Sequence, residues 1–128
     1  MSEEEVGFKA LDALLRAFGS GDPGQVLDRC TPDVVFEMPF LGLEVERPDF
    51  LRIIHGTTRR MEGLKFTDLV VEALSTPHAY LARYRGSATV SGRDYRQRYI
   101  TRFEVRDGLV SRFAEHFDTA AMKAVFAR

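Results

Sequence analysis

The sequence contains only one cysteine, three histidines and no tryptophan. The single Cys30 cannot form an internal disulfide. His55, His78 and His116 lie too far apart in the chain to form the Cys/His clusters that bind zinc. Glycine-rich phosphate loops, Walker motifs and the serine-centred nucleophile elbow are also absent. We therefore expect a site that uses neither a metal ion nor a cofactor.

Long apolar runs and an excess of charge are missing as well. The apolar runs are far shorter than the roughly 20 residues that a membrane-spanning helix needs. The net charge of −1 gives no overall field that would favour nucleic acid or an anionic membrane. The segment 1–5 carries three glutamates and does not have the positive charge and apolar stretch of a secretory signal. We expect a cytoplasmic protein that binds neither nucleic acid nor membranes.

What is present is typical of a globular protein with one core. The 128 residues are 45% apolar and 29% charged. There are no internal repeats and no segment with the composition of a linker. We therefore expect a single domain that spans residues 1–128.

The first half of the chain has three helical patterns. Ser2 and Glu5 form a capping box, after which apolar residues recur at helical spacing as far as Gly19. A second helix begins at Pro23 and a third at Pro48, because proline is favoured in the first turn of a helix. We expect the second helix to end at the segment 31–33 and the third at about residue 61.

The strands lie mainly in the second half. The expected ranges are 34–38, 66–74, 78–89, 95–105 and 109–117, with a loop or irregular hairpin at 40–47. Asp107-Gly108 is a strong hairpin signal and Ser91-Gly92 marks another turn. Thr119 is expected to cap a last helix that runs to residue 127. Helices followed by antiparallel strands predict an α+β fold with helices on one face of the sheet.

Side-chain alternation divides the three longest strands into two faces, because successive residues of a strand point to opposite sides. One face is rich in arginine and contains Arg83, Arg85, Arg96, Arg98, Arg102 and Arg112. It has no interleaved aromatic residues on which nucleic-acid bases could stack. We expect this face to be solvated or to contact a second copy in a homodimer. The opposite face is aromatic, and we expect the helices to cover it.

Glu115 is the residue that best indicates function. It lies between Phe113 and Phe117 on the aromatic face, and a buried carboxylate is costly unless it is paired, protonated or used in chemistry. Four further polar side chains share this face: Tyr80, Tyr84, Gln97 and Tyr99. So many polar groups predict a small-molecule pocket. The alternative is that Glu115 is a structural carboxylate that pairs with an arginine or lies at an exposed strand end.

The chain resembles the nuclear-transport-factor-2-like superfamily and, within it, the SnoaL-like and ketosteroid-isomerase-like proteins. The resemblance covers nearly the whole chain and is best over residues 95–99, 103–110 and 115–118. It implies a cone-shaped, curved antiparallel sheet packed on three helices from the N-terminal half, and a dimer through the sheet. Members of this fold include isomerases, cyclases, dehydratases, hydrolases and plain binding modules.

A closer likeness is to phenazine-biosynthesis A/B-type proteins. Residues 51–55 resemble their helical Leu-x-x-x-His segment, and Glu115 falls where they have an acid/base glutamate. The resemblance implies that His55 and Glu115 both face the pocket. Ketosteroid isomerases use an aspartate at the place that Met38 holds here, so their arrangement of the base is not expected.

Together these observations predict a cofactor-independent isomerase, cyclase or condensation-type enzyme for a small, partly apolar carbonyl compound. Glu115 would move the proton, His55 would be its partner, and Tyr99 would stabilise negative charge on oxygen. The other expected ligand-binding residues are Tyr80, Tyr84, Gln97, Phe36, Met38, Phe40 and Phe113. The alternative is a non-catalytic ligand-binding or dimeric interaction module of the same fold.

Overall fold

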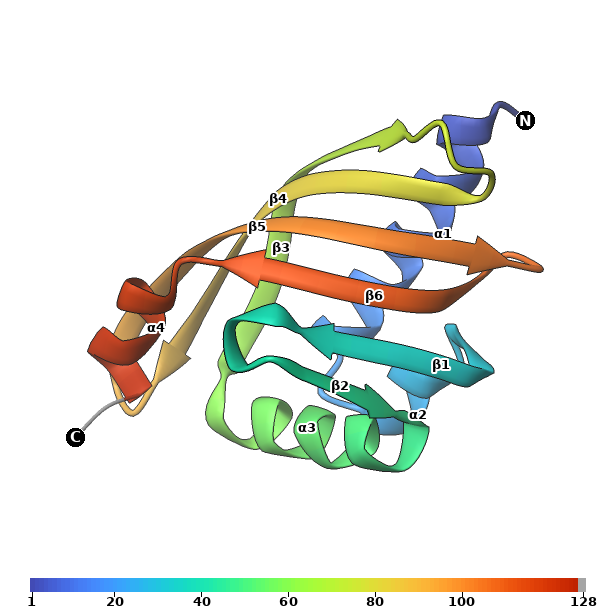
Figure 1. The fold of residues 1–128 in the computed structure, drawn as a ribbon. Helices are drawn as coiled ribbons and strands as arrows, with labels where there is room; N and C mark the ends of the chain where they lie inside the picture. The colour runs from blue at the N-terminus through green and yellow to red at the C-terminus, as the bar shows by residue number, and fades with distance from the viewer. Residues whose placement is uncertain (127–128) are drawn as a thin grey trace.

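Six strands form one curved sheet (Figure 1). Their spatial order is β2 (Leu43–Glu46), β1 (Cys30–Met38), β6 (Leu109–Phe117), β5 (Arg93–Arg106), β4 (Ala79–Val90) and β3 (Glu62–Ala73). The computed structural model describes residues 1–126. Neighbouring strands are antiparallel except β1 and β6, which run parallel. The predicted α+β class is confirmed.

Four α-helices and one 3-10 turn connect or cover these strands. They are α1 (Glu3–Gly19), α2 (Pro23–Leu27), η1 (Pro39–Leu41), α3 (Arg47–Arg60) and α4 (Thr119–Phe126). The Ser2 side chain accepts a hydrogen bond from the Glu5 backbone N–H, so the predicted cap of α1 is confirmed. In Figure 1, α1 lies behind the sheet, α3 lies below β1 and β2, and α4 lies beside the far ends of β5 and β6.

Several predicted boundaries are wrong. β3 begins at Glu62 and not at residue 66, since Glu62 already pairs with Thr89 of β4. Residues 31–33 were expected to be a break, but they lie inside β1, which begins at Cys30 because this residue already pairs with Val110 of β6. Thr119 does not cap α4. Asp118 does, since its carboxylate accepts hydrogen bonds from the backbone N–H groups of Ala120 and Ala121. The expected end of this helix, Ala127, lies outside the described residues.

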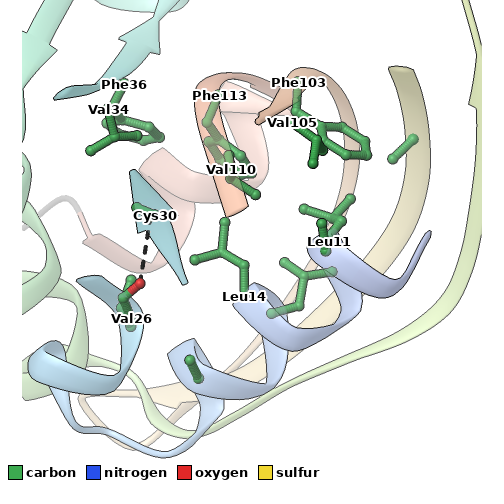
Figure 2. Close-up of a cluster of buried hydrophobic side chains, with 14 of the residues drawn as sticks. Leu11, Leu14, Val26, Cys30, Val34, Phe36, Phe103, Val105, Val110 and Phe113 are labelled. Carbon is green, nitrogen blue, oxygen red and sulfur yellow. Dashed lines mark hydrogen bonds between the residues drawn. The ribbon is translucent and has the colours of Figure 1, made fainter. Parts of the chain in front are cut away.

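The main core lies between α1, α2 and the inner face of the sheet. Figure 2 shows Leu11 and Leu14 of α1 beside Val110, which comes from β6. All three side chains are fully buried. Nearby, the Cys30 thiol donates a hydrogen bond to the Val26 carbonyl, which joins β1 to α2. Cys30 is therefore a structural residue, and burial raises the pKa of its thiol to about 12.

The two predicted sheet faces are confirmed by burial. In β4 and β5 the tyrosines Tyr80, Tyr84, Tyr95 and Tyr99 are buried. The intervening arginines Arg83, Arg85, Arg96 and Arg98 are exposed. Within residues 1–126, no helix has both the length and the apolar character required to cross a membrane.

Candidate active site

A pocket of about 440 Å³ lies between the inner face of the sheet, α3 and α4. Its wall is largely aromatic and includes Phe18, Phe40, Phe66, Phe113, Phe117 and Phe126. Met38, Met61 and Met122 also line it, which places three of the four methionines of the chain in one wall. Methionine is flexible and polarizable, so such a wall can adapt to ligands of different shape. A second hollow, of about 570 Å³, lies over exposed charged residues of β4 and β5 and has no comparable apolar wall.

Glu115 is the acidic residue of this pocket and is held by a chain of hydroxyl groups. One carboxylate oxygen, Oε2, accepts a hydrogen bond of 3.1 Å from the Tyr84 hydroxyl. The Tyr84 hydroxyl lies 2.7 Å from Oγ1 of Thr101. Tyr84 and Thr101 are both buried, on neighbouring strands. Because a phenol carries one proton, Thr101 must donate to Tyr84 whenever Tyr84 donates to Glu115.

The surroundings of Glu115 change its acidity. Burial raises the pKa of its carboxyl from 4.5 to about 7, while the hydrogen bond from Tyr84 lowers this pKa. At neutral pH, both the carboxylic acid and the carboxylate are therefore populated. A group in this state can either accept or donate a proton, as a general acid/base requires.

Tyr95 and Tyr99 of β5 also line the pocket. Burial raises the pKa of both phenols, and the charge of Glu115 raises each pKa further. They therefore remain protonated hydrogen-bond donors at neutral pH. The Gln97 side-chain amide donates to the Tyr95 oxygen at 2.9 Å, which leaves the Tyr95 proton free for another acceptor. Tyr95 is not among the predicted site residues, although the alternation of β5 puts residues 95 and 99 on the same face of the sheet.

His55 does not reach the pocket. It is exposed on α3, whereas Ile53, Thr57 and Arg60 of the same helix line the pocket and Ile54 enters the core. With 3.6 residues per turn, residues 53, 57 and 60 share one side of the helix, and residue 55 points away from it. The expected pair of His55 and Glu115 is therefore not formed.

Tyr80 is also outside the pocket, because it joins the sheet to α1. Its ring lies so close to Gly7 that a Cβ atom there would be 2.4 Å from Cδ1 of Tyr80. The Tyr80 hydroxyl donates to Oε1 of Glu3 at 3.0 Å, and its ring stacks on Phe103. The structure therefore does not bring Tyr80 to the pocket wall, and its ring and its hydroxyl both contact the first helix.

Gln97 and Phe36 are structural residues as well. The Gln97 amide donates to Tyr95 and to the Asp118 carbonyl, and its oxygen accepts from the backbone N–H groups of Arg98 and Asp118. Its hydrogen bonds therefore connect β5 to the start of α4 and leave none for a ligand. Phe36 is buried between two other phenylalanine rings, at centroid distances of 4.7 and 5.4 Å.

Tyr84 has a different place from the one expected, because its hydroxyl contacts Glu115 and not the cavity. The predicted residues that the structure does bring together in the pocket are Glu115, Tyr99, Met38, Phe40 and Phe113. Residues that only the structure revealed include Thr57 and Arg60, which come from the end of α3. Within the described part of the chain, no group of three or more His, Cys, Asp or Glu side chains is arranged to hold a metal ion.

Comparisons with known proteins agree with this architecture. The sequence profile of the SnoaL-like domain matches residues 11–113. A candidate isomerase from Bacillus subtilis is 23% identical, with a TM-score of 0.87 over 98% of this chain and 96% of that one. A candidate polyketide cyclase from Xanthomonas campestris is 20% identical, with a TM-score of 0.82 over 97% of this chain and 98% of the cyclase chain. The pinacolase BvnE from Penicillium brevicompactum is 12% identical, with a TM-score of 0.83 over 96% of this chain and 93% of the pinacolase chain.

No curated protein matches the chain in sequence. Identities at the level of these solved structures establish a shared fold and leave the activity to be argued from the site.

Proposed function

This chain belongs to the SnoaL-like domain family, and we propose that it is a cofactor-independent acid/base enzyme. Its substrate would be a small, partly apolar carbonyl compound bound in the pocket. The observation that carries this proposal is Glu115, a carboxyl group in an aromatic pocket whose pKa is raised to about 7 by burial. The names of three structural neighbours, a candidate isomerase, a candidate polyketide cyclase and a pinacolase, support it.

In the proposed reaction, the carboxylate of Glu115 removes a proton from a carbon next to the substrate carbonyl. The electron pair of the broken C–H bond moves onto the carbonyl oxygen and forms an enolate. Tyr99, with Tyr95 beside it, donates a hydrogen bond to that oxygen. Return of the proton from Glu115 to another carbon completes an isomerisation. Attack of the enolate carbon on a second carbonyl of the substrate would instead close a ring, and the alkoxide formed from that carbonyl would take the proton back from Glu115.

The apolar wall supports this chemistry in two ways. It excludes water, which strengthens the hydrogen bonds to the developing enolate. It also disfavours the charged form of Glu115, so that the pKa of this base lies close to neutral pH. The Tyr84–Thr101 chain limits the size of this shift and holds the carboxyl group in one orientation.

A proton-transfer probe tests the proposal without knowledge of the natural substrate. The base-catalysed opening of 5-nitrobenzisoxazole requires only that a base remove the ring C–H proton; the electron pair of that bond forms a nitrile as the N–O bond breaks, and a coloured phenolate is released. We expect the protein to accelerate this reaction with saturation in the probe. The value of kcat/KM should rise with pH and level off above a midpoint of about 7.

Two results would contradict the proposal. One is a rate no faster than that of acetate at the same concentration. The other is a rate that does not change between about pH 5 and about pH 9. Saturable binding of the probe without ring opening would instead identify a ligand-binding module that has no acid/base chemistry.

We further propose that the arginine-rich face of the sheet joins two copies of the chain in a homodimer. Val70 and Ile100 are 44% and 49% exposed and lie on either side of Arg83 in the sheet register. They line a hollow of about 460 Å³ that also contains Asp68 and Arg98. In a two-fold arrangement, Asp68 of one copy can lie opposite an arginine of the other.

This assembly can be tested by sedimentation at several protein concentrations. We expect a dimer for the wild type and a monomer for Ile100→Arg, because a further cation beside Arg83 and Arg98 would be unpaired at the centre of an interface of about 800 Å² per partner. Arg59→Glu on α3, away from this face, is the matched control and should remain dimeric. A monomeric wild type would overturn the idea.

A further inference from the structure

We propose that the pocket selects substrates that carry a carboxylate, and that Arg60 binds this carboxylate at the pocket mouth. The inference rests on the proposed function in one respect, namely that this pocket is the substrate site. It adds the chemical class of the substrate, an apolar acid, and its orientation.

Arg60 is the cationic residue of the pocket wall. Among the described residues that line the pocket, it is the only one with a positive charge, and Glu115 is the only one with a negative charge. The other polar lining groups are the hydroxyls of Thr57, Tyr95 and Tyr99. A wall of otherwise apolar residues with one cation at an exposed position is complementary to an apolar molecule with one anionic end.

The guanidinium of Arg60 has no carboxylate partner within residues 1–126. Several other arginines do have one: Arg112 pairs with Glu37 and Glu44, and Arg102 pairs with Glu104 at 2.7 Å. Arg60 forms no ion pair of this kind with the described part of the chain. Its N–H donors are therefore available to a ligand, and a guanidinium can bind a carboxylate through two parallel hydrogen bonds.

Phe126 holds the Arg60 guanidinium over the pocket. The Cζ atom of Arg60 lies 4.6 Å from the centroid of the Phe126 ring. That ring is in turn packed edge-on against Tyr95, at 5.6 Å between centroids. A guanidinium placed over an aromatic face is restricted in motion while its edge remains free to donate hydrogen bonds. Arg60 is thus ordered before a ligand arrives, which lowers the entropy lost on binding.

The two charges of the pocket would also orient the substrate. Glu115 in its ionised form repels a carboxylate, and Arg60 attracts it, so the acidic end of the substrate should lie at the mouth. The apolar remainder, with the reacting carbonyl, then lies toward Glu115 and the tyrosines. Because Arg60 is exposed, the carboxylate can keep part of its hydration and avoids the full cost of burial.

A matched pair of probes tests this inference by calorimetry. Biphenyl-4-carboxylate and biphenyl-4-carboxamide have nearly the same shape, but only the first is charged. We expect the wild type to bind the carboxylate about 5- to 30-fold more tightly than the carboxamide. In Arg60→Met the preference should fall to within about 2-fold, while the affinity for the carboxamide stays within about 2-fold of wild type.

Arg59→Met is the matched control, since Arg59 is the preceding residue of α3, is exposed and does not line the pocket. It should keep the wild-type preference. A preference that persists in Arg60→Met would overturn the inference, and so would equal binding of the two probes, or binding of neither, by the wild type. If the preference depends on Arg60 but 5-nitrobenzisoxazole is not opened, the acid/base function fails and the recognition of an anion stands.

Discussion

Replacement of Glu115 by glutamine should slow the opening of 5-nitrobenzisoxazole by about 100- to 10,000-fold, the usual contribution of a positioned general base. Glutamine has nearly the same shape as glutamate and can still accept the hydrogen bond from Tyr84, so the pocket should keep its form. What is lost is the carboxylate that takes the proton. The measurement is kcat/KM across the pH range, together with binding of the probe, which should change little.

Two further variants separate the chemistry from the architecture. Glu115→Asp keeps a carboxylate but shortens the side chain by a methylene group, which moves the carboxylate away from the substrate. We expect an activity between those of the wild type and Glu115→Gln. Tyr99→Phe removes a donor to the developing negative oxygen and should lower kcat more than it raises KM. If Glu115→Gln stays within a few-fold of the wild type, Glu115 is not the base.

The same substitution should stabilise the protein at alkaline pH. The pKa of Glu115 is raised by burial from 4.5 to about 7, so the unfolded chain releases this proton at a lower pH than the folded protein does. The free energy of unfolding therefore falls as pH increases between these values, by about 3 kcal/mol for this group. Below about pH 4.5 the carboxyl is neutral in both states and the penalty disappears.

Denaturant unfolding of the two proteins at several pH values measures this effect. The difference in unfolding free energy between Glu115→Gln and the wild type should grow by about 3 kcal/mol from acid to alkaline pH, because the other titrating groups are common to both. A difference that does not depend on pH would mean that the folded and unfolded proteins hold this proton equally well. If the expected difference is found, Glu115 supports activity at the expense of stability, as is frequent at active sites.

Tyr84→Phe is the natural companion to this experiment. The hydrogen bond from Tyr84 lowers the pKa of Glu115, so its removal should raise that pKa further. The midpoint of the pH–rate profile should therefore move to higher pH. A loss of activity without a shift of the midpoint would mean that Tyr84 supports the fold and does not tune the carboxyl.

The features that the amino-acid sequence predicts correctly are those with a local physical signal. The last strand was predicted at 109–117 and is observed at Leu109–Phe117, and its alternation placed Glu115 on the inner face. Alternation follows from the backbone geometry of any strand, and it needs no knowledge of what the strand packs against. The capping box of Ser2 and the hairpin turn at Asp107-Gly108 are local signals in the same sense.

The errors occurred where a contact between distant segments decides the outcome. The break expected at 31–33 was overridden by pairing of Cys30 with Val110. His55 was placed in the pocket by resemblance, yet the packing of Phe50 and Ile54 into the core turns it to solvent. A helical pattern identifies an apolar stripe. Whether a side chain at the edge of that stripe is buried or exposed depends on the elements against which the helix packs.

The sequence by itself determined that a carboxylate lies on an aromatic sheet face, because the period of two is a property of the strand alone. Only the tertiary structure decided which groups meet that carboxylate. Tyr84 of β4 donates a hydrogen bond to Glu115, Thr101 of β5 contacts the Tyr84 hydroxyl, and Arg60 lines the same pocket from a helix. The register of the sheet and the docking of that helix are set by packing across the whole core, which no local pattern records.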